Sequence, residues 1–129
     1  MSERFSLDHA VINVRDRIDD AAAIFTRLGF TLTPRGVHRT GSVNHLMVFG
    51  PDYLELIGFP PPALGMPIRP DLVDGPIGLD GLVLSLGNPK GVFAHLRANG
   101  FPTGEPQPLS RPLEIDGRPE EARFTTVRL

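Results

Sequence analysis

The alternation of apolar and polar residues along the chain predicts two similar halves. Residues 7–14 alternate as a β-strand does, and residues 79–86 begin with the same Leu-Asp pair and continue with a similar apolar pattern. Each strand is followed by a segment whose apolar residues recur at helical spacing and which ends in Gly-Phe, first at Gly29 and again at Gly100. Self-similarity of this kind predicts a fold built from a repeated unit.

Turn and cap residues divide each half into elements. Asp16 or Asp19 is the expected N-cap of the first helix, and Gly29 is its expected stop. A hairpin is expected around Pro51-Asp52, which suits a type I turn, and another around Asp116-Gly117. The first half therefore reads β-α-β-β-β, whereas the second half ends one strand short. The predicted strands after the helices are 31–34, 43–49 and 53–58 in the first half and 109–115 and 122–128 in the second.

A connector rich in proline and glycine separates the halves. Many of the 14 prolines fall between Gly58 and Gly81, where they exclude a central strand or a long helix because proline lacks an N–H donor and blocks the helical turn. One short turn is expected near 69–73. We expect a single domain over residues 1–129, made of a first unit 5–59, a connector 60–78 and an incomplete second unit 79–129.

The composition fits an ordinary globular protein. Of the 129 residues, 40% are hydrophobic and 22% are charged, which argues against disorder. The net charge of −2 gives no basic footprint for nucleic acid or for an anionic membrane. The absence of cysteine excludes disulfides, thiolate metal sites and cysteine nucleophiles. With no apolar signal core and no apolar run of membrane-spanning length, the sequence predicts a cytoplasmic protein.

The predicted hairpin can be given a register from its loop. A loop of even length centred on Pro51-Asp52 gives one face apolar walls together with Asn44, Tyr53 and Glu55, which is typical of a ligand cavity. A loop of odd length would reverse Asn44 relative to Glu55. The expected pairs are Val48 with Glu55, Leu46 with Ile57, and Asn44 with Phe59.

Besides Glu55, His9 is a candidate catalytic or metal-binding residue. It shares a face of the first strand with Asn13, and if that face is the concave one, His9 and Glu55 converge. Taken alone, the two residues are more simply interpreted as a hydrogen-bonded strand histidine and a solvated glutamate.

The order of elements and three motifs together resemble the vicinal oxygen chelate superfamily, whose members include glyoxalase I, extradiol dioxygenases and bleomycin-resistance proteins. The sequence is most similar to the glyoxalase-like domain family, over most of residues 5–101. The resemblance implies an α+β fold in which two paired β-α-β-β-β units form a curved mixed sheet around a cavity, with helices on the outer face. The motifs are Leu7-Asp8-His9-Ala10-Val11, the run 38–46 with its Gly41-Ser42-Val43-Asn44, and Tyr53-Leu54-Glu55-Leu56-Ile57.

The resemblance also implies a divalent metal, which would be Zn, Fe, Mn or Ni, with His9 and Glu55 as its ligands. The second half weakens this expectation, because Gly81 stands at the position that matches His9 and the strand that would bring a fourth ligand is missing. Without a metal, His9 and Glu55 would act as general base and acid. Burial would then raise the pKa of Glu55 and lower that of His9.

The expected function is that of a glyoxalase-like enzyme acting on a small oxygenated metabolite by lyase, isomerase or dioxygenase chemistry. His38 and Asn44 would position a substrate carbonyl or hydroxyl, with Tyr53 and Asn13 also facing the substrate. Simpler roles are a loop histidine for His38 and a turn-capping side chain for Asn44. The alternative functions are a metal-free protein that binds or sequesters a small molecule, and a divergent copy that only mediates association.

The missing strand bears on assembly. A sheet that ends at Arg128 leaves an unpaired edge, which invites pairing with another chain. We therefore expect a homodimer, or a chain cut short at its C-terminus.

Overall fold

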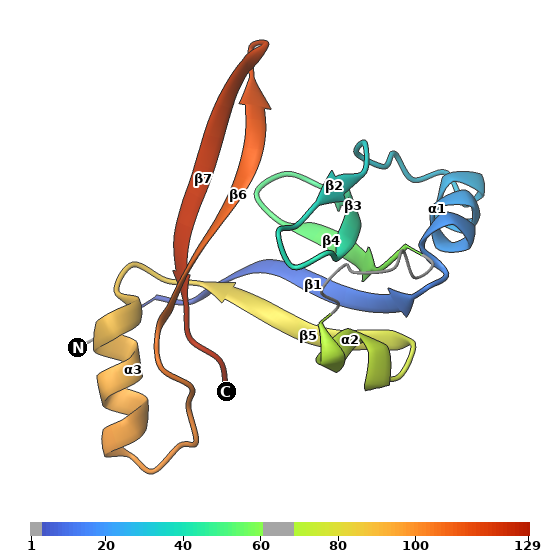
Figure 1. The fold of residues 1–129 in the computed structure, drawn as a ribbon. Helices are drawn as coiled ribbons and strands as arrows, with labels where there is room; N and C mark the ends of the chain where they lie inside the picture. The colour runs from blue at the N-terminus through green and yellow to red at the C-terminus, as the bar shows by residue number, and fades with distance from the viewer. Residues whose placement is uncertain (1–3, 61–68) are drawn as a thin grey trace. The chain divides into compact units, whose positions relative to one another are not determined.

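The computed structural model describes residues 4–60 and 69–129 (Figure 1). Ser6–Ser85 forms one compact unit, and Leu86–Leu129 belongs to another. All but the last residue of the strand expected to open the second half, 79–86, therefore belongs to the same compact unit as the first half. Part of the predicted connector, residues 61–68, lies outside the described residues.

A mixed five-stranded sheet organises the unit Ser6–Ser85. Its strand order is β2-β3-β4-β1-β5, in which β1 runs parallel to β4 and all other neighbours are antiparallel. The elements in chain order are β1 (Ser6–Arg15), α1 (Ile18–Arg27), β2 (Gly36–Val37), β3 (Val43–Val48), β4 (Tyr53–Gly58), α2 (Pro70–Asp74) and β5 (Gly78–Ser85). The expected α+β class is confirmed, and α2 confirms the turn expected near 69–73.

The unit Leu86–Leu129 contains a helix and a hairpin. Its elements are α3 (Pro89–Ala98), β6 (Gln107–Ile115) and β7 (Arg118–Thr126). The last two pair with each other as an antiparallel two-stranded sheet, whose turn at Asp116-Gly117 has positive φ angles of 51° and 75°. The hairpin and its turn are those that the sequence predicts, but the second strand begins four residues earlier than the predicted 122–128, directly after the turn. Across the described residues, no helix is long and apolar enough to cross a membrane.

Two local predictions for the first half are wrong. Helix α1 has Arg17 as its N-cap, without a side-chain hydrogen bond, instead of Asp16 or Asp19. The reason is the turn before it, in which Arg15 takes a φ of 53° and Arg17 N donates to Val14 O, so the helix begins beyond Asp16 and takes Asp19 into its first turn. Residues 31–34 do not form a strand. The only strand between α1 and β3, a stretch that the structure describes in full, is the two-residue β2, at Gly36–Val37.

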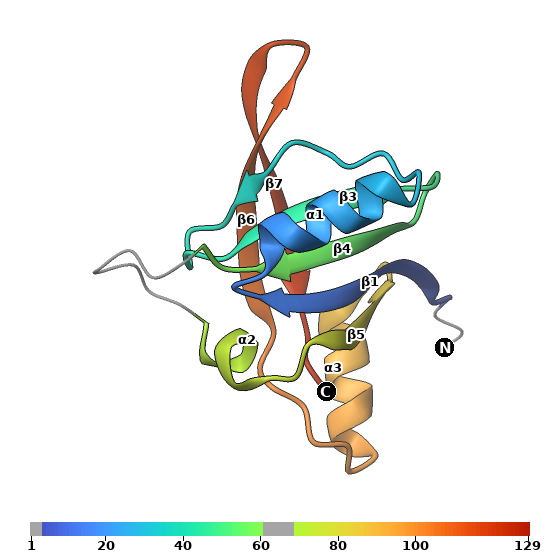
Figure 2. The same cartoon turned by 90° about the vertical axis from the view of Figure 1, so that its right-hand side faces the viewer.

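Apolar residues pack on both faces of the sheet. Helix α1 lies across one face of β1, β3 and β4, as Figure 2 shows, and covers the larger cluster. The short helix α2 contributes Leu72 to a smaller cluster with Ile57 and Phe59, which lies on the opposite face. The buried members of the larger cluster are Val14, Ile18, Val43, Met47 and Leu56.

The β3–β4 hairpin keeps the predicted faces but shifts the predicted register by two residues. Glu55 lies opposite Leu46, where the sequence predicted Val48, and Asn44 lies opposite Ile57, where the sequence predicted Phe59. The turn is centred one residue earlier than expected, with Gly50 at a φ of 143°. A shift of two residues leaves every side chain on its predicted face because the side chains of a strand alternate with a period of two.

Candidate active site

Two neighbouring strands bring His9 and Glu55 together. Strand β1 lies beside β4 with His9 paired to Tyr53 and Val11 paired to Glu55, so that all four side chains share one face of the sheet. His9 Nε2 lies 3.4 Å from Glu55 Oε2, and the two side chains are 14% and 11% exposed. This face is opposite the one that α1 covers. The convergence that the sequence suggested is therefore present in the structure.

Asp8 is a member of the site that the sequence did not suggest. Adjacent residues of a regular strand point to opposite faces, yet Asp8 Oδ1 lies 2.6 Å from His9 Nδ1. The pairing of β1 with β5 shifts its register between Leu7 and His9, so Asp8 is the extra residue of a bulge. Bulges turn side chains away from the regular alternation. A bulge leaves no plain mark in this sequence, which is why the contact was missed.

Asn44 forms a hydrogen bond with the other oxygen of the Glu55 carboxylate. Its Nδ2 donates a hydrogen bond of 2.7 Å to Glu55 Oε1, and the residue is only 4% exposed. Glu55 therefore faces His9 with one oxygen and Asn44 with the other. A buried carboxylate requires such partners, because leaving its oxygens unpaired away from water is costly.

His38 continues this network from the loop after β2. His38 Nε2 lies 3.5 Å from Asn44 Nδ2, and His38 Nδ1 lies 2.7 Å from Ser42 Oγ. Ser42 is 1% exposed, and its role was not predicted although it stands inside the Gly-Ser-Val-Asn motif. The expected proximity of His38 and Asn44 to Glu55 is found, but both residues contact protein groups here.

Tyr53 and Asn13 occupy different places on the same face. Tyr53 stacks on the imidazole of His9 with ring centroids 4.4 Å apart and an angle of 9° between the rings. Asn13 is fully buried, donates from Nδ2 to Leu72 O at 3.0 Å, and accepts from Arg15 N. Asn13 therefore ties β1 to α2, and we do not place it among the residues that face a substrate.

The electrostatics of the pair are the reverse of what burial alone predicts. Burial raises the pKa of Glu55, but the hydrogen bonds from His9 and Asn44 outweigh this effect and leave the pKa below its usual value. Burial likewise lowers the pKa of His9, but its contacts with Glu55 and Asp8 leave that pKa above its usual value. The structure thus favours an imidazolium facing a carboxylate. The expected directions were wrong because they left out the mutual contact.

The pair meets only part of the requirement for a divalent metal. Its nitrogen and oxygen are suitable donors, and Asp8 on the far ring nitrogen of His9 resembles the outer partner that metal-bound histidines usually have. However, catalytic zinc takes three protein ligands, and within residues 4–60 and 69–129 no group of three or more His, Cys, Asp or Glu residues could hold a metal. Gly81, opposite Val11 on β5, adds no ligand. The described residues therefore do not form a complete metal site.

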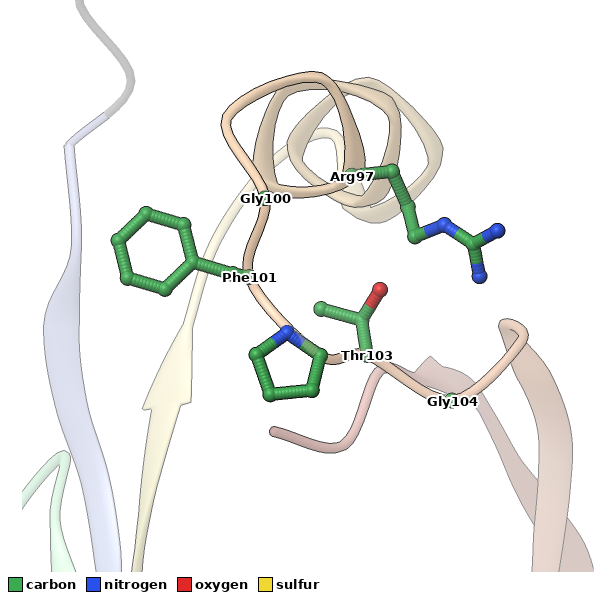
Figure 3. A pocket seen from close by; sticks show the side chains of 6 residues that line it. Arg97, Gly100, Phe101, Thr103 and Gly104 are labelled. Carbon is green, nitrogen blue, oxygen red and sulfur yellow. The ribbon is translucent and has the colours of Figure 1, made fainter.

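A hollow of about 510 Å³ lies elsewhere, in the unit Leu86–Leu129 (Figure 3). It follows the end of α3 and contains the guanidinium of Arg97 and the side chain of Thr103, whose Oγ1 is buried without a partner. No carboxylate or imidazole lines it, so it offers no acid–base pair. Its lining residues are Arg97, Gly100, Phe101, Pro102, Thr103 and Gly104.

A mixed sheet that is backed by one helix and carries an imidazole–carboxylate pair on its other face defines an α+β protein with a polar site between strands. Comparison with protein families identifies this class more closely. Residues 7–129 match the glyoxalase-like domain family, and the chain belongs to that family, which is part of the vicinal oxygen chelate superfamily. The resemblance seen in the sequence is thus confirmed.

The fold is shared with a solved structure. The crystal structure of a hypothetical protein from Staphylococcus aureus superimposes with a TM-score of 0.73 at 15% sequence identity. The match covers 96% of this chain and 52% of that protein, so the chain spans about half the length of its structural relative. At this identity the likeness shows the fold alone. A comparison with curated proteins found none that matches.

Proposed function

We propose that this chain is a glyoxalase-like enzyme that transfers a proton on a small oxygenated molecule, with Glu55 and His9 as its acid–base pair. The observation that supports this proposal most directly is the 3.4 Å approach of His9 Nε2 to Glu55 Oε2, on two neighbouring strands of a glyoxalase-like fold. Two titratable groups whose pKa values are pushed apart are a frequent arrangement at catalytic sites.

The protonation states assign a role to each group. Glu55, held ionised, takes the proton from a carbon next to a carbonyl group. His9, held as the imidazolium, gives its Nε2 proton to the carbonyl oxygen, so that the C–H bond breaks and an enol forms. Where the deprotonated carbon carries a hydroxyl group, delivery of the proton from Glu55 to the former carbonyl carbon, with loss of the hydroxyl proton to His9, completes an isomerisation. Where the carbon on its other side carries a leaving group, departure of that group with its bonding electrons, with return of the proton on the carbonyl oxygen to His9, completes a lyase reaction.

The surroundings of the pair favour this chemistry. Val11, Leu46 and Ile57 share the face of the sheet with Glu55 and supply apolar neighbours. In such surroundings a charge acts more strongly on a developing oxyanion than it does in water. Tyr53, stacked on His9, supports one face of the imidazole, so that the ring edge bearing Nε2 is directed at Glu55.

The test is exchange of carbon-bound hydrogen with deuterium from the solvent. A set of small 2-oxoaldehydes and 2-hydroxycarbonyl compounds is incubated in D₂O with the wild type, His9→Gln, Glu55→Gln and, as the matched control, Glu105→Gln, whose side chain is 70% exposed. We expect the two site variants to lose roughly 10²- to 10⁴-fold in exchange rate while the control retains it. Exchange by Glu55→Gln at the wild-type rate would contradict the proposal.

The same experiment addresses the alternative function. A compound that raises the melting temperature of the wild type without any exchange or turnover would indicate a metal-free binding or sequestering protein. Exchange that disappears after treatment with a chelator and returns with Zn, Fe, Mn or Ni would instead indicate a metal-assisted enzyme, with ligands beyond His9 and Glu55.

A further inference from the structure

The contacts of the Asn44 side-chain nitrogen fix the orientation of its amide group. Nδ2 carries two hydrogens, and two acceptors lie near it: Glu55 Oε1 at 2.7 Å and His38 Nε2 at 3.5 Å. The reverse orientation of the amide would place Oδ1 against the carboxylate of Glu55, where two oxygens would repel each other. The carboxylate therefore selects the orientation in which Asn44 donates.

The oxygen side of the same amide depends on a glycine. Gly36 on β2 is paired with Asn44 on β3, and a Cβ added at Gly36 would lie 2.3 Å from Asn44 Oδ1. No side chain fits between that oxygen and the backbone of β2. A strand interior usually disfavours glycine, so the residue serves here to let a backbone approach closely.

A tight loop supports the second contact of the amide nitrogen. His38 N donates to Ser42 O at 2.8 Å, and Gly41 N donates to His38 O, which closes the loop between β2 and β3. His38 Nδ1 lies 2.7 Å from Ser42 Oγ, and Ser42 is buried. In the neutral imidazole, acceptance by Nε2 of His38 from Asn44 places the proton on Nδ1, which then donates to Ser42 Oγ.

We propose that Asn44 is a positioning residue for Glu55, held in place by Gly36 and by the His38–Ser42 loop, and that it acts through the carboxylate instead of touching the substrate. By occupying Oε1, Asn44 leaves Oε2 to face His9. The inference deepens the proposed function, because presenting Oε2 is what the proton transfer needs. It also replaces the substrate-contact role that the sequence suggested for Asn44 and His38, whose described polar contacts are to protein atoms.

The experiment measures the pKa of the Glu55 carboxyl group directly and needs no substrate. Protein labelled with ¹³C at the glutamate side chains is titrated by NMR, and the carboxyl signal of Glu55 is followed in the wild type and in Asn44→Leu. The leucine keeps the volume and the burial but removes the donor. We expect the pKa of Glu55 to rise in Asn44→Leu, because burial is then opposed by fewer hydrogen bonds. An unchanged titration would overturn the proposal.

A pair of glycine variants separates positioning from general damage. Gly36→Ala introduces a methyl group against Asn44 Oδ1, whereas Gly81→Ala, also in a strand of the same sheet, introduces one into open space. We expect the pKa of Glu55 to rise in Gly36→Ala and to stay at its wild-type value in Gly81→Ala. Equal behaviour of the two variants would overturn the role of Gly36. Dispersed amide spectra confirm that each variant is folded, and Ser42→Ala, with a smaller rise, supplies a milder perturbation if Gly36→Ala unfolds.

The titration and the exchange assay fail independently. A wild type that exchanges no substrate, together with a raised Glu55 pKa in Asn44→Leu, refutes the proposed function but supports the positioning. An Asn44→Leu protein that loses exchange while its Glu55 titrates normally overturns the positioning, because Asn44 would then touch the substrate itself.

Discussion

A histidine held between two carboxylates controls the charge of this site. Asp8 contacts one ring nitrogen of His9 and Glu55 faces the other, so the imidazolium is favoured from both sides. The two carboxylates are not equivalent, because the Asp8 side chain is 39% exposed and screened by water, whereas that of Glu55 is 11% exposed. Loss of the contact with Glu55 is therefore expected to lower the stability of the folded chain more than loss of the contact with Asp8.

The pair predicts a pH window for stability. The pKa of Glu55 is lower in the folded chain than its ordinary value of 4.5, so its contribution is present above pH 4.5 and is lost as the pH falls through the folded pKa. The pKa of His9 is higher than its ordinary value of 6.5, so its contribution is present below pH 6.5 and is lost as the pH rises through the folded pKa.

Urea unfolding of the wild type and His9→Gln at a series of pH values measures this window. We expect the difference in unfolding free energy to be largest between about pH 4.5 and 6.5 and to shrink on both sides. A difference that stays constant with pH, or that grows above pH 6.5, would show that the two groups do not form the pair described here.

Asp8 is predicted to act on the titration of His9. In Asp8→Asn, the imidazolium loses a charged partner at 2.6 Å, so the pKa of His9 falls and is read from the ring-proton signals by NMR. Asp80→Asn is the matched control, because Asp80 follows Leu79 as Asp8 follows Leu7 and is exposed. A His9 that titrates identically in wild type and Asp8→Asn would contradict the assigned contact.

Individual residues also show which features of the site could be predicted from the sequence and which could not. The shared face of Asn44 and Glu55 was predictable because it depends only on the parity of the strand. The pKa directions were not, since they depend on a contact between residues 46 positions apart, and a desolvation argument for each group alone gives the wrong sign. Asp8 required the bulge, which appears only when β1 and β5 are paired.

At the scale of elements, the two ten-residue helices α1 and α3 end in the same way. After α1, Gly29 N donates to Thr26 O and Phe30 N donates to Phe25 O, and the two phenylalanine rings lie 5.7 Å apart. After α3, Gly100 N and Phe101 N make the corresponding bonds to α3 carbonyls. This is the Schellman arrangement, in which the glycine adopts a left-handed conformation. The Gly-Phe repeat was thus a sound predictor of where the helices end.

Gly29→Ala tests the importance of this ending. Gly29 has a φ of 103°, a region that an alanine adopts only with strain, although no atom lies within 4 Å of an added Cβ. We therefore expect a loss of about 1–2 kcal/mol in unfolding free energy, from conformation alone. Gly81→Ala is the control, since its Cβ also meets open space but its φ is not positive. Equal stabilities of the two variants in urea would contradict the explanation.

Other element boundaries were less predictable, for identifiable reasons. Thr33 was expected in a strand, but its Oγ1 accepts from Leu46 N while its backbone N donates to Leu46 O, so a side chain replaces part of the ladder. The N-cap of α1 was misplaced because the turn at Arg15 takes a left-handed φ that no local pattern announced. The hairpin register moved because Gly50, and not Asp52, stands at the centre of the turn with Pro51.

At the scale of the whole molecule, the buried core is unevenly divided. Both hydrophobic clusters are made by residues of Ser6–Ser85. In Leu86–Leu129, all of which is described, Val92 is the only buried hydrophobic residue, while Leu109, Ile115 and Phe124 are each at least 45% exposed. The structure describes a single chain, so the homodimer expected from an unpaired edge stays a prediction.

The uneven core predicts a difference in local stability that amide hydrogen exchange can measure. A two-stranded hairpin without a covering layer is marginal in water, and local opening occurs most readily where few apolar contacts are buried. We expect amides of β3 and β4, which flank Met47 and Leu56, to exchange at least about tenfold more slowly than those of β6 and β7. Protection of β6 and β7 that rises with protein concentration would support the homodimer. Protection equal to that of β3 and β4 at high dilution would contradict the prediction, because the hairpin would then be stabilised without the buried contacts that β3 and β4 possess.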